Sequence, residues 1–129
     1  MKLLVIGAGM MGSAAAYDMA RAESVDSVTL ADTDRKRARD AASRINKLAR
    51  TDKVRAVEVD ASSEKASAKL MRGHDAALSA VPYFYNLGLA RAAVEARCTL
   101  PISAATTPLS ARNWRGFSSN PERYRWSSA

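Results

Sequence analysis

The residues best placed to do chemistry are three glycines near the start of the chain, in Gly7-Ala8-Gly9-Met10-Met11-Gly12. Their spacing matches G-x-G-x-x-G: the first glycine allows a tight turn, the second leaves room for a pyrophosphate, and the third lets a helix pack closely on a strand. A helix expected over residues 10–22 would direct its free N–H groups at the phosphates. We therefore expect Gly7, Gly9, Met10, Met11 and Gly12 to bind phosphate.

Two strand patterns position this segment. The apolar run Leu-Leu-Val-Ile at residues 3–6 precedes the glycines and is typical of a strand buried on both faces of a parallel sheet. A second strand over residues 27–31 is followed by Asp32, 20 residues beyond Gly12, where a carboxylate accepts hydrogen bonds from the adenosine ribose. These features predict a dinucleotide site. The alternative is a tight strand-to-helix turn followed by an ordinary acidic loop residue.

The rest of the first 96 residues continues to alternate between helix and strand patterns. They predict a helix capped by Thr33 or Asp34 that runs to Ala49, a strand over 54–59, a helix over 64–71, a strand over 75–81 and a helix that includes 89–94. This order predicts an α/β fold, a Rossmann-like doubly wound parallel sheet with strand order 3-2-1-4 and right-handed crossovers.

In such a sheet the ligand lies outside the carboxyl ends of the strands, at the switch point between the first and fourth strands. Ala80, Val81 and Pro82 follow the fourth strand and are expected to line the nicotinamide side. Asp60 and Ala61 follow the third strand and are candidates for the adenine side, although a capping or turn role for them is equally compatible with the sequence.

The choice between NAD and NADP depends on opposing charges. Arg35 or Lys36, early in the second helix, could reach the 2′-phosphate that distinguishes NADP. Asp32 argues the other way, because its carboxylate repels that phosphate. The sequence therefore predicts NAD or NADP as cofactor, with a slight preference for NAD.

Composition narrows the class of protein. The chain has 129 residues and one cysteine, Cys98, so it has no internal disulfide, and we expect a cytoplasmic protein. The apolar runs are too short for a membrane span, and the start lacks a signal-peptide pattern. The net charge is +7, of which residues 97–129 contribute +4 through five basic residues and one acidic residue. Without a recognition motif or spaced aromatic residues, we expect no nucleic-acid partner.

Four stretches carry a family resemblance: Val-Ile-Gly-Ala-Gly-Met-Met-Gly, Leu-Ala-Asp-Thr-Asp, Val-Glu-Val-Asp and Ser-Ala-Val-Pro-Tyr-Phe-Tyr-Asn. Together, over residues 1–96, they resemble the N-terminal nucleotide-binding domain of saccharopine dehydrogenase-like oxidoreductases. The resemblance implies a Rossmann domain followed by a larger domain, and oxidation or reduction at a carbon–nitrogen centre with NAD or NADP. By position, the glycine segment would hold the pyrophosphate, Asp32 the ribose, and residues 80–82 the nicotinamide half.

In the family, the second domain supplies the substrate pocket, the acid–base groups and any oligomer contacts. Nothing in this sequence replaces it: there is no metal-ligand cluster or nucleophile–base pair, and His74 is interpreted as structural. We therefore expect a truncated cofactor half that is not catalytically complete alone, with catalytic residues unknown and no metal. The alternatives are a non-catalytic dinucleotide-sensing module and the cofactor half of another NAD-dependent amino-acid dehydrogenase. A neighbouring reading frame that encodes the second domain would favour the first interpretation.

The pattern changes after residue 96. We expect residues 97–129 to form an irregular tail, the product of a reading-frame shift, and the outer edge of the fourth strand to lack its usual partner. Reading each codon from the third base of one printed codon and the first two of the next permits Asp-Leu-Gly-Gly-Asn over residues 102–106, the motif expected there from the family. It also turns Asn113-Trp114 into a codon for leucine and permits Val-Val-Ile over residues 125–128.

Resequencing the gene around codon 97 and past codon 129 tests the frame shift. We expect a single-base insertion or deletion near codon 97, followed in the restored frame by sequence for the second domain. An intact frame through Ala129 with no such sequence downstream would rule the shift out.

Overall fold

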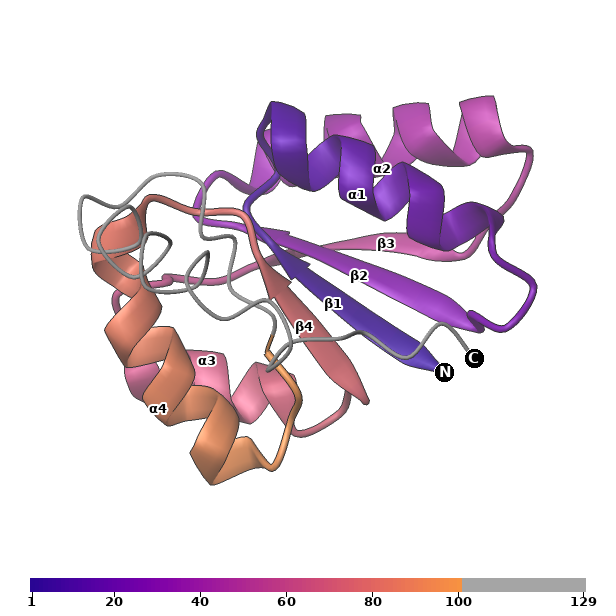
Figure 1. Ribbon diagram of the computed structural model, residues 1–129. Helices are drawn as coiled ribbons and strands as arrows, with labels where there is room; N and C mark the ends of the chain where they lie inside the picture. Colours follow the sequence, from indigo (N-terminus) through magenta and orange to yellow (C-terminus); the bar gives the residue numbers. More distant parts are fainter. Residues whose placement is uncertain (101–129) are drawn as a thin grey trace, which may run out of the picture.

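A computed structural model describes residues 1–100 and shows one parallel sheet in the order β3-β2-β1-β4 (Figure 1). The strands are β1 (Lys2–Ile6), β2 (Ser27–Asp32), β3 (Val54–Glu58) and β4 (Ala76–Ser79). All three strand pairs are parallel. The predicted fold class and strand order are therefore confirmed.

The helices form a layer on each face of the sheet. The helical elements are α1 (Met10–Arg21), α2 (Arg35–Ala49), α3 (Glu64–Met71), the short 3-10 turn η1 (Tyr83–Tyr85) and α4 (Asn86–Ala96). Figure 1 shows α1 and α2 together on one face, and α3 and α4 together on the other. The crossovers through α1 and α2 each lead to a neighbouring parallel strand, whereas the crossover through α3 carries the chain from β3 at one edge to β4 beside β1, as a doubly wound fold requires.

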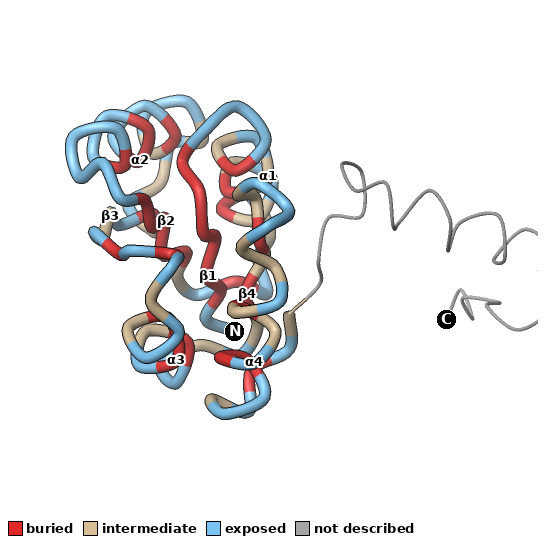
Figure 2. The backbone as a smooth tube through the Cα atoms, turned by 90° about the vertical axis from the view of Figure 1, so that its left-hand side faces the viewer, coloured by how far each residue is buried: buried red, intermediate tan, exposed pale blue. Residues whose placement is uncertain are grey.

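Strand β1 lies at the centre of the core, which explains its continuous apolar run. Leu4, Val5 and Ile6 have no exposed surface. Val5 belongs to the cluster formed with α1 and α2, whereas Leu4 and Ile6 belong to the cluster formed with α3 and α4. Figure 2 shows the buried path of β1 through the middle of the molecule. Because both faces of β1 are covered, apolar side chains are required at successive positions.

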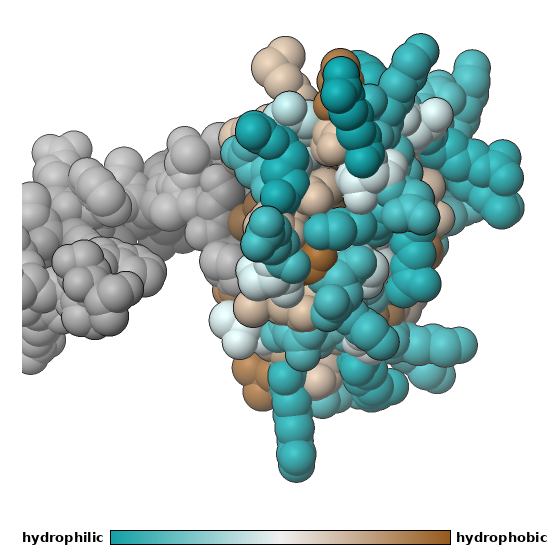
Figure 3. Space-filling view, turned by 90° about the vertical axis from the view of Figure 1, so that its right-hand side faces the viewer, coloured by the Kyte–Doolittle hydropathy of each residue, from teal (hydrophilic) through white to brown (hydrophobic). Residues whose placement is uncertain are grey.

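The end of the sheet at which the strands begin carries mainly hydrophilic side chains. Figure 3 views this end of the molecule, and charged and polar residues cover most of it. Among the described residues, no helix combines the length and the apolar character needed to cross a lipid bilayer.

The chain returns to the sheet after α4. Thr99 forms a parallel bridge with Ala76 at the outer edge of β4, and the Ala77 N–H donates to the Thr99 carbonyl oxygen at 2.8 Å. Cys98 is buried in the cluster under α3 and α4. The edge predicted to lack a partner is therefore paired at one point. The predicted irregular tail and the codons read across residues 102–128 lie outside the described residues, apart from the first four positions of that tail.

Helix α3 offers a matched pair of stability tests. The Ser63 hydroxyl caps this helix by accepting from the Ala66 N–H at 3.2 Å. Ser67, one turn later, is wholly buried, and its hydroxyl has no hydrogen-bond partner among the described residues. A capping hydroxyl stabilises a helix, whereas a buried hydroxyl without a partner destabilises the fold.

We expect Ser67→Ala to raise the free energy of unfolding by about 1 kcal/mol, because it removes an unsatisfied hydroxyl and improves helix propensity. Ser63→Ala, the same chemical change on the same helix, should lower it by about 1 kcal/mol. Urea denaturation of both variants measures the two values. Destabilisation of the Ser67 variant would mean that its hydroxyl has a bonding partner.

Candidate functional site

The turn after β1 depends on two glycines that admit no side chain. Gly7 has a φ of +107°, and a Cβ atom there would lie 2.6 Å from the Ala80 carbonyl oxygen. A Cβ atom on Gly12 would lie 1.7 Å from the Gly7 carbonyl oxygen. Both separations are far below contact distance. Helix α1 therefore packs directly on the turn, and the turn packs directly on the segment after β4.

Gly9 differs, because a Cβ atom there would meet no atom within 4 Å. It is the N-cap of α1, and no side chain of the described residues caps this helix. The first helical bond runs from the Ser13 N–H to the Gly9 carbonyl oxygen at 2.9 Å. The backbone N–H groups of Met10 and Met11 thus precede any intrahelical partner, and both methionine side chains are exposed. The helix presents free donors and its positive dipole end beside open space.

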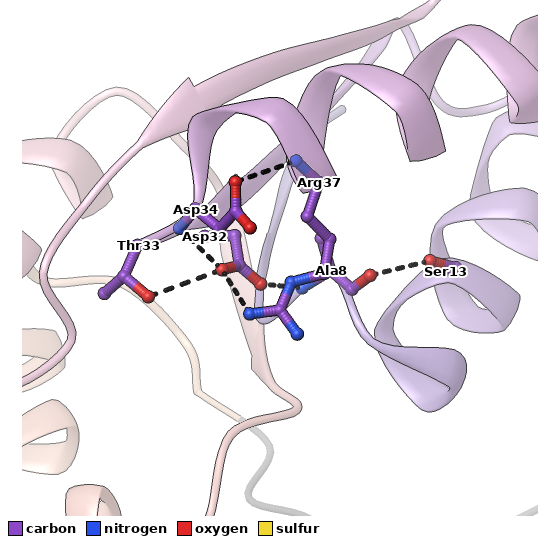
Figure 4. Close-up of polar contacts among 6 residues, drawn as sticks. All are labelled: Ala8, Ser13, Asp32, Thr33, Asp34 and Arg37. Carbon is purple, nitrogen blue, oxygen red and sulfur yellow. Dashed lines mark hydrogen bonds and ion pairs between the residues drawn. The ribbon is translucent and has the colours of Figure 1, made fainter.

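Asp32 joins three segments at the end of β2. Its Oδ2 accepts from the Ala8 N–H in the glycine turn at 2.8 Å, and its Oδ1 accepts from the Asp34 N–H at 2.8 Å (Figure 4). The Arg37 Nη2 lies 3.3 Å from the same Oδ1. The Asp32 side chain is only 8% exposed, so its charge is held by these donors rather than by water.

The protonation of Asp32 reflects this balance. Burial, the largest single influence, acts to raise its pKa, because it disfavours the charged form. The hydrogen bonds from the Asp34 and Ala8 backbone and the positive charge of Arg37 together outweigh burial, so the pKa of Asp32 lies below its ordinary value. Asp32 is therefore an ionised hydrogen-bond acceptor at neutral pH.

A cavity of about 310 Å³ lies at the carboxyl ends of β1 and β2, between the glycine turn, the start of α2 and the segments that follow β3 and β4. Its lining is partly apolar and includes one carboxylate and one guanidinium. The lining residues are Ile6, Gly7, Gly9, Asp32, Thr33, Arg37, Val59, Ala61, Ala80, Val81, Pro82 and Tyr85.

The structure brings together most of the residues predicted from the sequence. The cavity lining contains seven of them: Gly7, Gly9, Asp32, Ala61, Ala80, Val81 and Pro82. Met10, Met11 and Gly12 stand beside it in the first turn of α1. Asp60 lies outside this lining, where its Oδ1 accepts from the Ser62 N–H at 2.9 Å and from the Ser62 hydroxyl at 2.6 Å. This contact is the turn role that the sequence also allowed for Asp60, and its cofactor role stays a prediction.

Sequence reasoning missed the other lining residues, of which Thr33, Arg37 and Tyr85 carry polar groups. Arg37 stands three residues after Asp34, whose carboxylate accepts from the Arg37 N–H at 3.1 Å. The Asp34 cap could have identified Arg37 as a lining residue, because side chains in the first turn of a helix lean back toward its N-terminus. Arg35 and Lys36, the predicted cations, are exposed and do not line the cavity.

His74 lies away from this cavity, in the turn before β4. Its Nδ1 is 2.9 Å from the Leu70 carbonyl oxygen, and its Nε2 is 2.8 Å from the Thr29 hydroxyl. A carbonyl oxygen only accepts, so Nδ1 carries a proton and donates to Leu70, while Nε2 shares a hydrogen bond with the Thr29 hydroxyl. Both ring nitrogens are thus engaged in holding the turn against the sheet, which agrees with the structural interpretation of this residue.

Comparison with known proteins decides the family. Residues 3–111 match the saccharopine dehydrogenase NADP binding domain. The chain belongs to this family. The match extends beyond Ala96, where the sequence pattern predicts a departure, and the predicted domain boundary at that residue stays a prediction. The saccharopine dehydrogenase NADP binding domain binds NAD or NADP, so the family supports a dinucleotide site in this chain.

Three solved structures are similar to this chain in fold. Saccharopine dehydrogenase (L-Glu forming) from Saccharomyces cerevisiae superposes with a TM-score of 0.67 at 17% identity, over 87% of this chain and 23% of that one. UDP-glucose-4-epimerase from Stenotrophomonas maltophila, with bound NAD, gives 0.66 at 24% identity, over 79% and 36%. Quinate dehydrogenase from Corynebacterium glutamicum, in complex with NAD, gives 0.54 at 26% identity, over 63% and 27%. The chain thus spans about a quarter to a third of their lengths.

The lowered pKa of Asp32 predicts acid sensitivity. A carboxylate with a lower pKa in the folded state stabilises the fold above its unfolded pKa, about 3.9, and this contribution is lost as the pH falls through the folded value. We expect Asp32→Asn to be less stable than the parent at pH 7, and the difference to shrink as the pH falls below about 4. Denaturant titration between pH 7 and pH 2.5 measures this.

Asp40→Asn is the matched control for this experiment. Asp40 is exposed on α2 and makes no hydrogen bond or ion pair within residues 1–100. The Asp40→Asn substitution should change the free energy of unfolding little at both ends of the pH range. A constant difference between parent and Asp32 variant across the whole range would contradict the stabilising role of the ionised carboxylate.

Proposed function

We propose that this chain is the dinucleotide-binding part of an NAD(P)-dependent oxidoreductase that acts at a carbon–nitrogen centre. The observation that carries the proposal is the cavity at the carboxyl ends of β1 and β2, where the glycine turn, an uncapped helix start and a buried carboxylate meet. Membership of the saccharopine dehydrogenase NADP binding domain family supports it.

The residues present fit a dinucleotide. Gly9 leaves open space beside the free N–H groups of α1, and this is where a pyrophosphate would be held by Gly7, Gly9, Met10, Met11 and Gly12. A side chain at Gly9 would occupy that space without disturbing the protein. Gly7 and Gly12 serve differently, since they allow the close packing that shapes the turn.

The proposed positions of the two halves of the dinucleotide follow from the direction of the parallel strands. Asp32 would accept from the adenosine ribose, with Ala61 and Asp60 on the adenine side, while Ala80, Val81 and Pro82 would flank the nicotinamide. The bound cofactor would supply hydride transfer. The buried negative charge of Asp32 supports a slight preference for NAD.

We also propose a cytoplasmic location for the protein.

The substrate-handling groups are proposed to belong to a second domain, as the family resemblance implies. Within residues 1–100, no group of three or more His, Cys, Asp or Glu side chains is arranged to hold a metal ion. The charged side chains in the cavity lining are Asp32 and Arg37, which bind one another. Catalytic residues for the reaction therefore stay unassigned in this chain.

Calorimetric titration with NAD tests the proposed site. We expect the parent to bind NAD and Gly9→Val to lose binding at least tenfold, because the side chain fills the phosphate space. Gly73→Val is the matched control: a Cβ atom there would come no closer than 4.0 Å to the Leu70 carbonyl oxygen, and Gly73 lies outside the cavity lining.

The control should bind NAD like the parent, and both variants should unfold cooperatively. Unchanged affinity in a folded Gly9→Val variant would reject the phosphate site. Failure of the folded parent to bind either NAD or NADP would reject the proposed function itself.

A further inference from the structure

The start of α2 carries four cations, Arg35, Lys36, Arg37 and Arg39, and Arg37 is the one among them that lines the cavity. Its Nη2 lies 3.3 Å from the Asp32 Oδ1, and its side chain is 54% exposed. Figure 4 shows the guanidinium reaching back from the first turn of the helix to the carboxylate at the end of β2. A half-exposed positive charge therefore stands beside the predicted ribose position.

We propose that Arg37 binds the 2′-phosphate of NADP by exchanging its ion pair with Asp32 for one with the phosphate. The cavity would then accept both dinucleotides, and Arg37 would set the ratio of their affinities. This inference rests on the proposed function, because it assigns a further residue to the same site.

The exchange leaves Asp32 satisfied. When Arg37 moves away, the carboxylate still accepts from the Ala8 N–H at one oxygen and from the Asp34 N–H at the other, both at 2.8 Å. The lost contact is a single one at 3.3 Å to a half-exposed side chain, and such ion pairs contribute little to stability. Arg37 therefore moves at low cost, and no buried charge is left without a hydrogen bond.

The phosphate offers Arg37 a stronger partner. A phosphate monoester carries a charge of about −1.5 to −2 at pH 7 and presents three acceptor oxygens. A guanidinium matches this geometry with two parallel hydrogen bonds. Asp32 alone would repel the 2′-phosphate, so a neighbouring cation is required for NADP to enter. With NAD, the ribose hydroxyl faces Asp32, and Arg37 keeps its ion pair, which is why NAD stays slightly preferred.

The experiment measures the dissociation constants of NAD and NADP by calorimetry for the parent, Arg37→Ala and Arg39→Ala. Arg39 is exposed on the same helix and lies outside the cavity lining, so its substitution removes the same charge without the contact. We expect Arg37→Ala to weaken NADP about tenfold or more, as for a lost charge-assisted hydrogen bond, and to change NAD less than about threefold. Arg39→Ala should change neither by more than about twofold.

A pH series separates phosphate binding from a structural effect. The second ionisation of a phosphate monoester has a pKa of about 6, so the parent should lose affinity for NADP relative to NAD between pH 7.5 and 5.5. This relative loss should shrink in Arg37→Ala. Arg37→Lys, which keeps the charge, should recover part of the NADP affinity.

The outcomes of this test are distinct from those of the proposed function. If the parent binds NAD but not NADP, or if Arg37→Ala weakens both cofactors equally, the inference is overturned while the proposed function stands. If Arg35→Ala or Lys36→Ala lowers NADP affinity and Arg37→Ala does not, the phosphate is bound by the cations first predicted from the sequence.

Discussion

The structure depends on the direct contact between the backbones of Gly7 and Gly12. A Cβ atom on Gly12 would lie 1.7 Å from the Gly7 carbonyl oxygen, so helix α1 can occupy its position only when residue 12 has no side chain. The same turn touches Ala80 after β4, where Gly7 has no room for a Cβ atom. These contacts fix the glycine turn, the start of α1 and the segment after β4 relative to one another. They place the start of α1 at the switch point, where the strand order reverses and a ligand site is expected.

Asp32 extends this arrangement to the second crossover. One carboxylate oxygen holds the glycine turn through Ala8, and the other holds the start of α2 through Asp34. Asp32, the residue expected to accept from a ribose, thus also holds the glycine turn and the start of α2 together. These hydrogen bonds orient its carboxylate before a ligand binds. Because Asp32 is negatively charged, a second negative group beside it needs a neighbouring positive charge. Within the cavity lining, Arg37 is the group that can compensate a second negative charge.

Much of this could be predicted from the sequence because its signals are local. The spacing of Gly7, Gly9 and Gly12, the apolar run before them and the acidic residue after β2 each reflect a requirement of a short segment. The order of strands was expected because the glycine fingerprint is typical of the Rossmann fold, whose strands follow the order 3-2-1-4 with right-handed crossovers. The mutual approach of Ala61 and Val81 to one cavity also followed, since all parallel strands end on the same side of the sheet.

The part of the site that could not be predicted depends on which side chains at the start of α2 face the cavity. Four cations begin α2, and composition alone does not indicate which of them faces Asp32. The answer follows from the cap: Asp34 fixes where the helix begins, and this places Arg37, rather than Arg35 or Lys36, over the end of β2. Asp60 illustrates the same limit, because only the structure shows that its carboxylate is engaged by Ser62.

The residues just after α4 still follow the pattern of the fold. Arg97 adopts a φ of +54°, a left-handed conformation at a helix end that favours glycine, and arginine adopts it at a cost of about 1 kcal/mol. The next residues nevertheless follow the fold: Cys98 is buried in the core, and Thr99 pairs with Ala76 where a fifth parallel strand would begin. A right-handed crossover through α4 leads to that edge. Arg50 ends α2 in the same left-handed conformation, with a φ of +53°, so this kind of helix end also occurs among the first four strands. The parallel pairing that organises those strands therefore continues at Thr99.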